Sequence, residues 1–240
     1  MVADGRSTVL SIVSVPPCPF GRPSRVNELV LLAACWIGYF ALHSALASLA
    51  VKRAVAARWP RVVPAYRLGF NAVALLLILP LLAWTLGHPG PELWRWRGPW
   101  RWVADGSAAL ALIGVLWTLR DYDGGEFLGL RQWRDRERRV EDQERFHLSP
   151  LHRFVRHPWY SLGLVLLWTR DMDAARLVAA SLATGYVLIG IRLEERKLLE
   201  YHGARYRAYR ERVPALLPLP WRWLDAAAAE RFRDRPADRP

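Results

Sequence analysis

Four long apolar runs limit this chain to a narrow choice of folds. They cover residues 29–50, 68–86, 103–119 and 174–193 and contain very few charged side chains. Each is close to the roughly 20 residues that an α-helix needs to cross the hydrocarbon core of a bilayer. The mean hydropathy of +0.03 does not contradict this, because polar connectors offset the apolar runs in the average. The sequence therefore predicts an all-α, polytopic membrane protein.

A fifth apolar segment, residues 151–168, is too interrupted to be an ordinary lipid-facing span. Pro158 favours a bend or a helix start there. Four polar residues, 170–173, separate this segment from the last apolar run, so the two should form a tight hairpin. We therefore expect about five membrane segments, with the polar clusters at 156–158 and 194–195 at the same end of this C-terminal helical hairpin.

The positive charges of the chain lie mainly in the connectors and give a formal net charge of +12. In membrane proteins such connectors follow the positive-inside bias and contact anionic headgroups, which argues against nucleic-acid binding. The connector after the first run is basic and contains no acid, whereas loop 87–102 contains Glu92. We place the first connector in the cytoplasm. Its basic residues are Lys52, Arg53, Arg58 and Arg61.

Polar side chains at the mouth of the hairpin form an amphiphilic set. They are Arg156, His157, Tyr160, Glu194, Glu195 and Tyr206. Such groups are costly to bury beside lipid, so they usually bind something polar. This set offers donors for a carboxylate, acceptors for an amine or a ribose, and aromatic faces, which are the needs of S-adenosylmethionine. Pairing of the carboxylates with Arg192 or Arg196 on the same helix is an alternative that the spacing leaves open.

His43 lies inside the first apolar run, in the stretch WIGYFALHSALA. A histidine in a membrane span is a functional candidate, but Ser44 or a backbone carbonyl of a neighbouring helix can satisfy it. From the sequence we favour packing over direct chemistry at this position.

The polar connector after residue 120 contains two different parts. Residues 134–145 are strongly charged, and we interpret them as a solvated cytoplasmic loop with a short surface helix. Residues 127–132, FLGLRQ, place apolar side chains around a glycine and end in Arg131 and Gln132. We expect this second part to re-enter the membrane interface and line a pocket.

The C-terminal half carries a resemblance to a known superfamily. RHPWY with Gly163 after it, followed by EExxLxxxxGxxYxxYxxxVPxxxP, resembles the isoprenylcysteine carboxyl methyltransferase and phospholipid methyltransferase superfamily. The segments FLGLRQ, TRDMDAARL, LHSALA and YRLGFN are similar to the bacterial methanethiol S-methyltransferase branch and to NnrU-type membrane proteins. Together the resemblance covers residues 29–218.

This resemblance implies a multi-pass methyltransferase of the bacterial inner membrane that binds S-adenosylmethionine at its cytoplasmic face. The acceptor, a small thiol or lipophilic molecule, would enter from the bilayer, and no obligate protein partner is inferred. The catalytic candidates are His157, Glu194 and Arg131. The cofactor-binding candidates are Arg156, His157, Pro158, Tyr160, Gly163, Glu194, Glu195 and Tyr206.

One departure from the superfamily pattern bears on the acceptor. Prenylcysteine enzymes commonly carry Arg four residues before the first Glu, and the matching residue here is Gly190. Arg192 could replace that cation only if the helix turned, although Arg131 could supply charge from the 127–132 segment. We therefore favour thiol methylation over prenylcysteine carboxyl methylation. For a thiol, His157 or a glutamate would serve as the base.

The predicted organisation has four parts: a disordered leader (1–26), a three-helix membrane scaffold (27–120), a methyltransferase region (121–221) and a disordered tail (222–240). An NnrU-type accessory or transport protein without catalytic activity is the alternative function. A reductase that binds NADPH ranks lower, because the chain is short and lacks a cluster for the nucleotide phosphate. No metal site is expected, since the spacing of His147, His152 and His157 scatters them around a helix.

Overall fold

The computed structural model describes residues 25–121, 123–137 and 148–232. Four of its helices are long and apolar enough to cross a membrane, and a fifth, shorter helix is also apolar. The predicted all-α, polytopic fold with about five membrane segments is therefore confirmed. The long helices are α1 (Arg25–Ala47), α3 (Val63–Gly87), α4 (Pro99–Thr118) and α8 (Ala174–Arg212), and the short one is α7 (Pro158–Trp168).

The outer surface of this bundle is apolar. On α3, Leu76 is 71% exposed, and Leu75 and Leu79 are each more than half exposed. Soluble monomers rarely expose contiguous apolar surface of this kind. The outer surface therefore faces lipid, as in a multi-pass membrane protein.

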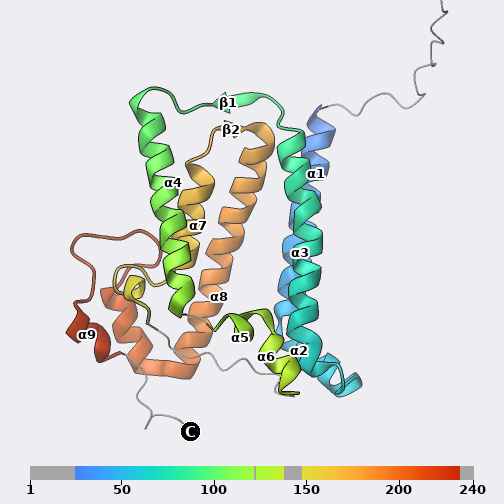
Figure 1. The fold of residues 1–240 in the computed structure, drawn as a ribbon, viewed down its shortest axis with the longest axis vertical. Coiled ribbons are helices and arrows are strands. Elements are labelled where there is room, and N and C mark those ends of the chain that lie inside the picture. Colours follow the sequence, from blue (N-terminus) through green and yellow to red (C-terminus); the bar gives the residue numbers. More distant parts are fainter. Residues whose placement is uncertain (1–24, 122, 138–147, 233–240) are drawn as a thin grey trace, which may run out of the picture.

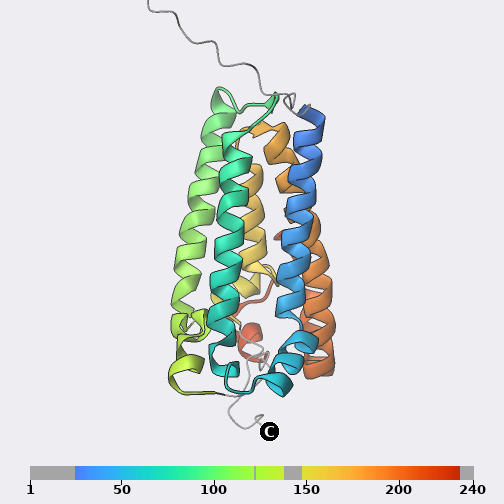
Figure 2. The ribbon, with the colours of Figure 1, turned by 90° about the vertical axis from the view of Figure 1, so that its right-hand side faces the viewer.

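The helices pack in two groups (Figures 1 and 2): α1 lies against α3 and α8, and α4 lies against α7. Between α1 and α8, the rings of Phe40 and Tyr186 stack with their centroids 4.4 Å apart. Trp168 Nε1 donates to Thr184 Oγ1 at 3.0 Å and links α7 to α8. Hydrogen bonds between side chains thus join helices whose apolar surfaces alone would not fix their positions.

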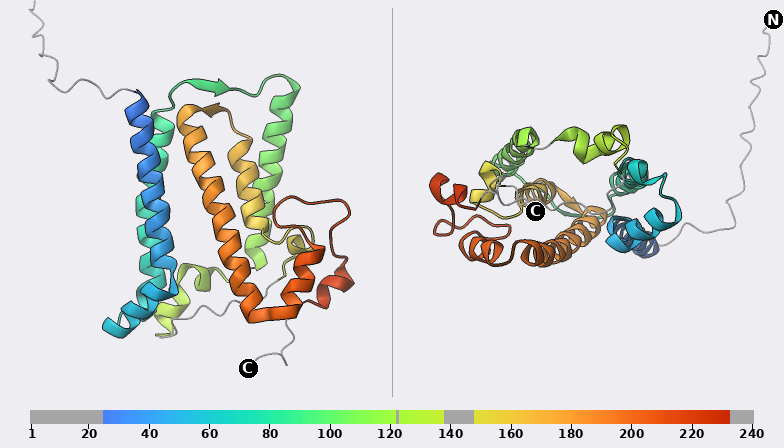
Figure 3. Two further views of the ribbon diagram at one scale, coloured as in Figure 1. Left: turned by 180° about the vertical axis from the view of Figure 1, so that it is seen from behind. Right: turned by 90° about the horizontal axis from the view of Figure 1, so that it is seen from below.

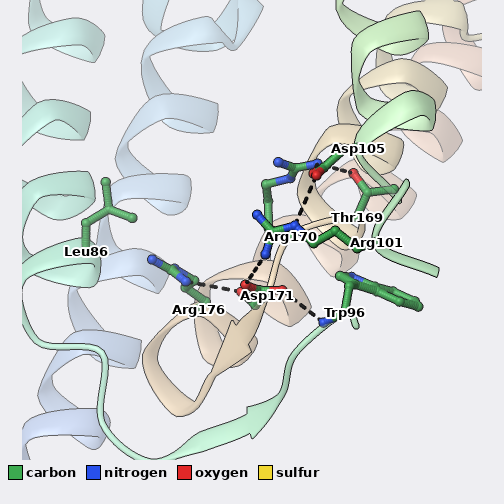
Figure 4. A pocket seen from close by; sticks show the side chains of 8 residues that line it. All are labelled: Leu86, Trp96, Arg101, Asp105, Thr169, Arg170, Asp171 and Arg176. Carbon is green, nitrogen blue, oxygen red and sulfur yellow. Dashed lines mark hydrogen bonds and ion pairs between the residues drawn. The ribbon is translucent and has the colours of Figure 1, made fainter. Parts of the chain in front are cut away.

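A small antiparallel sheet closes one end of the bundle. Strand β1 (Glu92–Trp94) pairs with β2 (Met172–Asp173), which lies in the turn between α7 and α8. Asp171 Oδ1 accepts from the backbone N–H of Trp96 at 3.0 Å, and Asp171 Oδ2 lies 3.4 Å from Arg101 Nη1 (Figure 4). The polar turn at 170–173 is therefore held by the α3–α4 connector, and its charges have partners of opposite sign.

The opposite end carries the short helices α2 (Leu49–Arg58), α5 (Gly124–Leu128) and α6 (Leu130–Arg134). Asn71 Nδ2 on α3 donates to the carbonyls of Phe127 and Leu128, each at 3.1 Å. Gly129 has φ 88°, and a Cβ there would lie 2.7 Å from the backbone nitrogen of Leu68. Segment 127–132 is therefore packed closely on α3. Most of the charged stretch at 134–145 lies outside the described residues.

After the membrane, α8 changes direction at Gly203, which has φ 50° and ψ −124°. The chain after Gly203, residues 204–221, forms what we call the returning segment. It packs beside the base of α7, together with the 3₁₀ helix η2 (Pro150–Arg153) and α9 (Ala226–Glu230) (Figure 3).

Two predicted boundaries need correction. Residues 222–232 are ordered, because Leu224 and Ala229 are buried against Tyr206 and Tyr209, so the prediction of a disordered tail was wrong for this stretch. At the other end, residues 25 and 26 of the predicted leader belong to α1. The remainder of the leader and tail lies outside the described residues.

Candidate functional site

The hairpin of α7 and α8 brings the two predicted polar clusters together at the end opposite the β1–β2 sheet. Arg156 Nη2 lies 2.6 Å from Glu195 Oε1, and Arg156 Nε donates to the same oxygen at 2.7 Å. The two side chains are only 9% and 12% exposed. Glu195 therefore pairs with Arg156 across the hairpin and not with Arg192 or Arg196 on its own helix.

Arg156 also holds the chain that follows α8. Its Nη1 donates to the carbonyls of Arg210 (3.1 Å) and Val213, and its backbone N–H donates to Pro214 O at 2.8 Å. A buried guanidinium needs such partners for its donors. Arg156 thus ties α7, α8 and the returning segment to one another.

His157 lies between the two glutamates and is only 4% exposed at its side chain. Its Nε2 lies 3.2 Å from Glu195 Oε1, and its Nδ1 lies 3.7 Å from Glu194 Oε2. The imidazole stacks on the ring of Tyr160 with the centroids 5.6 Å apart. Pro158, the first residue of α7, fixes the backbone that presents His157 and Tyr160.

The two glutamates have different surroundings. Glu195 is enclosed by Arg156 and His157, whereas the Glu194 side chain is 42% exposed. The Tyr160 hydroxyl donates to Glu194 Oε2 at 3.4 Å. Glu194 is therefore the carboxylate of this cluster that a bound molecule can reach, with the ring of Tyr160 beside it.

Two predicted cofactor-binding residues, Tyr206 and Gly163, lie outside the group formed by Arg156, His157, Tyr160 and the two glutamates. Tyr206 is 1% exposed, and its ring lies 6.0 Å from that of Tyr209 in the core of the returning segment. At Gly163, an added Cβ would meet no atom within 4 Å. Tyr206 therefore packs beneath the cluster, and Gly163 borders open space on α7.

Arg131 is held within its own loop. Its ion pairs among the described residues are with Asp123 (3.3 Å), Glu126 (3.7 Å) and Asp135 (3.9 Å). Backbone N–H groups of Glu126 and Gly125, followed by the Arg131 guanidinium, hold the pKa of Asp123 below its usual range. The described structure gives Arg131 no interaction with His157 or Glu194.

Sequence reasoning missed three contributors to this site. Arg210 Nη1 lies 4.0 Å from Glu195 Oε2, the carbonyl of Val213 accepts from Arg156, and Ser161 Oγ donates to Leu216 O at 2.7 Å. The VPxxxP pattern at residues 213–218 was the available signal. It marked the segment without showing that its backbone carbonyls complete the site.

The apolar bundle and the buried polar cluster at the mouth of its hairpin define a multi-pass membrane protein, and its relatives are methyltransferases. The chain is 32% identical over 232 residues to methanethiol S-methyltransferase 2 of Bradyrhizobium diazoefficiens, covering 92% of this chain and 83% of the relative. It is 36% identical over 222 residues to the methanethiol S-methyltransferase of Mycobacterium tuberculosis, covering 85% and 82%. The chain belongs to the methanethiol S-methyltransferase family and is a methyltransferase. No family model and no solved structure matches it.

Proposed function

We propose that this protein transfers the methyl group of S-adenosylmethionine to the sulfur of a small thiol, in the inner membrane of a bacterium. The observation that carries the proposal is the polar cluster on α7 and α8, in which Glu194 stays accessible while Glu195 is enclosed. The family supports the same reaction, since its curated relatives are named methanethiol S-methyltransferases.

The residues of the cluster fit such a cofactor. The Glu194 carboxylate would accept hydrogen bonds from an amino group or a ribose, and Tyr160 offers a hydroxyl and a ring face beside it. The first turn of α7 has backbone N–H groups suited to a carboxylate. When bound, the cofactor supplies an electrophilic methyl group on a sulfonium. Arg156 and Glu195 would act indirectly, by fixing the position of His157.

The basic connector supports a cytoplasmic position for the cofactor. Helix α2 and the residues after it carry Lys52, Arg53, Arg58 and Arg61, and this connector lies at the same end of the bundle as the lower half of α8 (Figure 1). Positive connectors are retained in the cytoplasm. A cofactor made in the cytoplasm would therefore reach Glu194 without crossing the membrane.

The surroundings of Gly190 favour a thiol over a carboxylate acceptor. An added Cβ at this position would meet no atom within 4 Å, so the site has room but no cation of its own. Catalysis would come from aligning a nucleophilic sulfur with the sulfonium methyl in a site that excludes water.

Isothermal titration of S-adenosylmethionine and S-adenosylhomocysteine into the detergent-solubilised protein tests the cofactor. Incubation with S-adenosylmethionine and ethanethiol, followed by gas chromatography for ethyl methyl sulfide, tests the reaction. We expect binding of both compounds and formation of the thioether. If the folded protein binds neither compound, the proposal is wrong and the NnrU-type accessory or transport role moves to first place.

A further inference from the structure

We propose that His43, held by Tyr186, is the base that removes the proton from the acceptor thiol inside the membrane. This inference rests on the proposed thiol methylation and names the residue that activates the acceptor. The sequence alone favoured packing at His43, and the position of its partner on α8 changes that interpretation.

His43 on α1 is held across the bundle by α8. Its Nδ1 lies 2.8 Å from the Tyr186 hydroxyl, which also receives a hydrogen bond from Ser44 Oγ at 3.2 Å. The ring of Phe40 stacks on Tyr186 and fixes its position. In the tautomer that carries its proton on Nδ1, Nδ1–H donates to the Tyr186 oxygen. Nε2 is then the unprotonated nitrogen available to an acceptor thiol, and no hydrogen bond joins it to another described residue.

Tyr186 is aligned with the cofactor end of α8. Tyr186, Gly190 and Glu194 follow one another at four-residue spacing, so they occupy one face of the helix. The helical rise places Tyr186 about 12 Å from Glu194 along the axis. At one end of this face the Tyr160 hydroxyl donates to Glu194 Oε2 at 3.4 Å, and at the other the Tyr186 hydroxyl contacts His43. The face therefore has the cofactor cluster at one end and His43 at the other.

Gly190 leaves a space in the middle of the row formed by Tyr186, Gly190 and Glu194 on α8. Between Tyr186 and Glu194, an added Cβ would meet no atom within 4 Å. A sulfur atom and a transferring methyl group need such a space, since the nucleophile, the methyl carbon and the leaving sulfur must lie in line. The row thus has the Glu194 carboxylate at one end, Tyr186 with its partner His43 at the other, and room between them at Gly190.

The pocket beside His43 suits a small acceptor. It has a volume of about 10 Å³, is lined on α1 by Tyr39 and Leu42 and on α3 by Phe70 and Leu77, and is otherwise apolar. The ring of Phe70 lies 5.0 Å from the imidazole. A void of this volume holds about one water-sized group, which is the size of a sulfhydryl and not of a whole thiol. Its apolar lining suits the sulfhydryl of a small, uncharged thiol whose alkyl part lies outside the void.

The proposed step is balanced. The thiol S–H bond breaks and its proton passes to His43 Nε2, while Nδ1–H donates to the Tyr186 oxygen. The sulfur electron pair then forms a bond to the methyl carbon. The electrons of the broken methyl–sulfonium bond stay on the donor sulfur, which becomes neutral, and His43 leaves the step as an imidazolium.

Two thiols with the same carbon skeleton but different acidity test this role. Ethanethiol needs a base, whereas 2,2,2-trifluoroethanethiol is more acidic and ionises readily without one. We expect His43→Gln to slow methylation of ethanethiol by about 100-fold or more, the scale of general base catalysis. Methylation of the fluorinated thiol should fall much less. His88→Gln, which changes an exposed histidine at the far end of α3, is the matched control and should leave both rates unchanged.

Two further measurements separate chemistry from structure. S-adenosylhomocysteine should bind His43→Gln and the native protein equally, and the ultraviolet absorbance of bound thiolate should appear only with the native protein. Tyr186→Phe, which keeps the ring but removes the hydroxyl, should show the same selective loss to a smaller extent. If His43→Gln does not fold, this second variant carries the test.

An equal loss for the two thiols, or no loss, would overturn the role of His43 while leaving the proposed function intact. Absence of thioether with the native protein would instead contradict the proposed function itself.

Discussion

Arg156 and Glu195 are 39 residues apart in sequence, yet two guanidinium nitrogens of Arg156 lie 2.6 and 2.7 Å from the same Glu195 oxygen. This contact closes the mouth of the hairpin, because the guanidinium also donates to the carbonyls of Arg210 and Val213 at the end of α8. The pair is buried and supported by further hydrogen bonds, the condition under which an ion pair repays its desolvation.

Breaking this pair should destabilise the protein. Arg156→Gln leaves the Glu195 carboxylate without its principal cation, and a buried charge that loses its partner costs about 3–5 kcal/mol. We expect a large fall in the midpoint of thermal unfolding in detergent. Arg196→Gln, an exposed neighbour on α8, is the control. Equal midpoints for the two variants would show that the pair is not structural.

Replacing Glu194 should weaken cofactor binding without unfolding the site. Glu194→Gln keeps the shape of the side chain but removes its charge, and a hydrogen bond to a charged group contributes about 1.5–3 kcal/mol. Titration should therefore show S-adenosylhomocysteine binding weakened by about 10- to 100-fold. Glu200→Gln, further along α8, should bind as the native protein does. Unchanged binding by Glu194→Gln would exclude Glu194 as a ligand of the cofactor.

A substitution at Gly129 should be far more harmful than one at Gly69. The positive φ of Gly129 and the close approach of Leu68 leave no room for a Cβ, whereas a Cβ at Gly69 meets nothing within 4 Å. Gly129→Ala should cost at least about 1–3 kcal/mol from backbone strain. Gly69→Ala should be neutral or slightly stabilising, since it lies inside α3. Thermal unfolding of both variants checks this difference.

The sequence predicted those parts of the fold that the bilayer dictates. A helix that crosses the bilayer needs an apolar run of about 20 residues. Because a short polar turn at 170–173 joins two apolar segments, the two must form a hairpin. The meeting of His157 with Glu194 and Glu195 follows from that hairpin. These inferences depend on local pattern alone.

The remaining contacts depend on packing between segments that are distant in sequence. Nothing near Leu224 shows that it is buried against Tyr206, so the stretch at 222–232 was predicted to be disordered. The hydrogen bond between His43 and Tyr186 joins residues 143 apart, and no periodicity indicates it. Arg131 has a suggestive place in its motif, but three carboxylates of its own loop hold it.

Filling the space at Gly190 should stop thiol methylation while leaving the cofactor bound. Gly190→Leu places a side chain between Tyr186 and Glu194, where the structure has no atom within 4 Å of a Cβ. Since Gly190 lies one helical turn from Glu194, S-adenosylhomocysteine should still bind within a few-fold of its native affinity. Formation of ethyl methyl sulfide should fall by at least about 100-fold, because a misplacement of about 1 Å already costs on that scale.

Gly38→Leu provides the matched control for this substitution. Gly38 lies on an exposed face of α1, where a Cβ also meets nothing within 4 Å, and its replacement should preserve both binding and turnover. A Gly190→Leu protein that still methylates ethanethiol at the native rate would place the transfer elsewhere in the bundle. Joint loss of cofactor binding and turnover would instead show that Gly190 borders the cofactor itself, and that the acceptor approaches from another side.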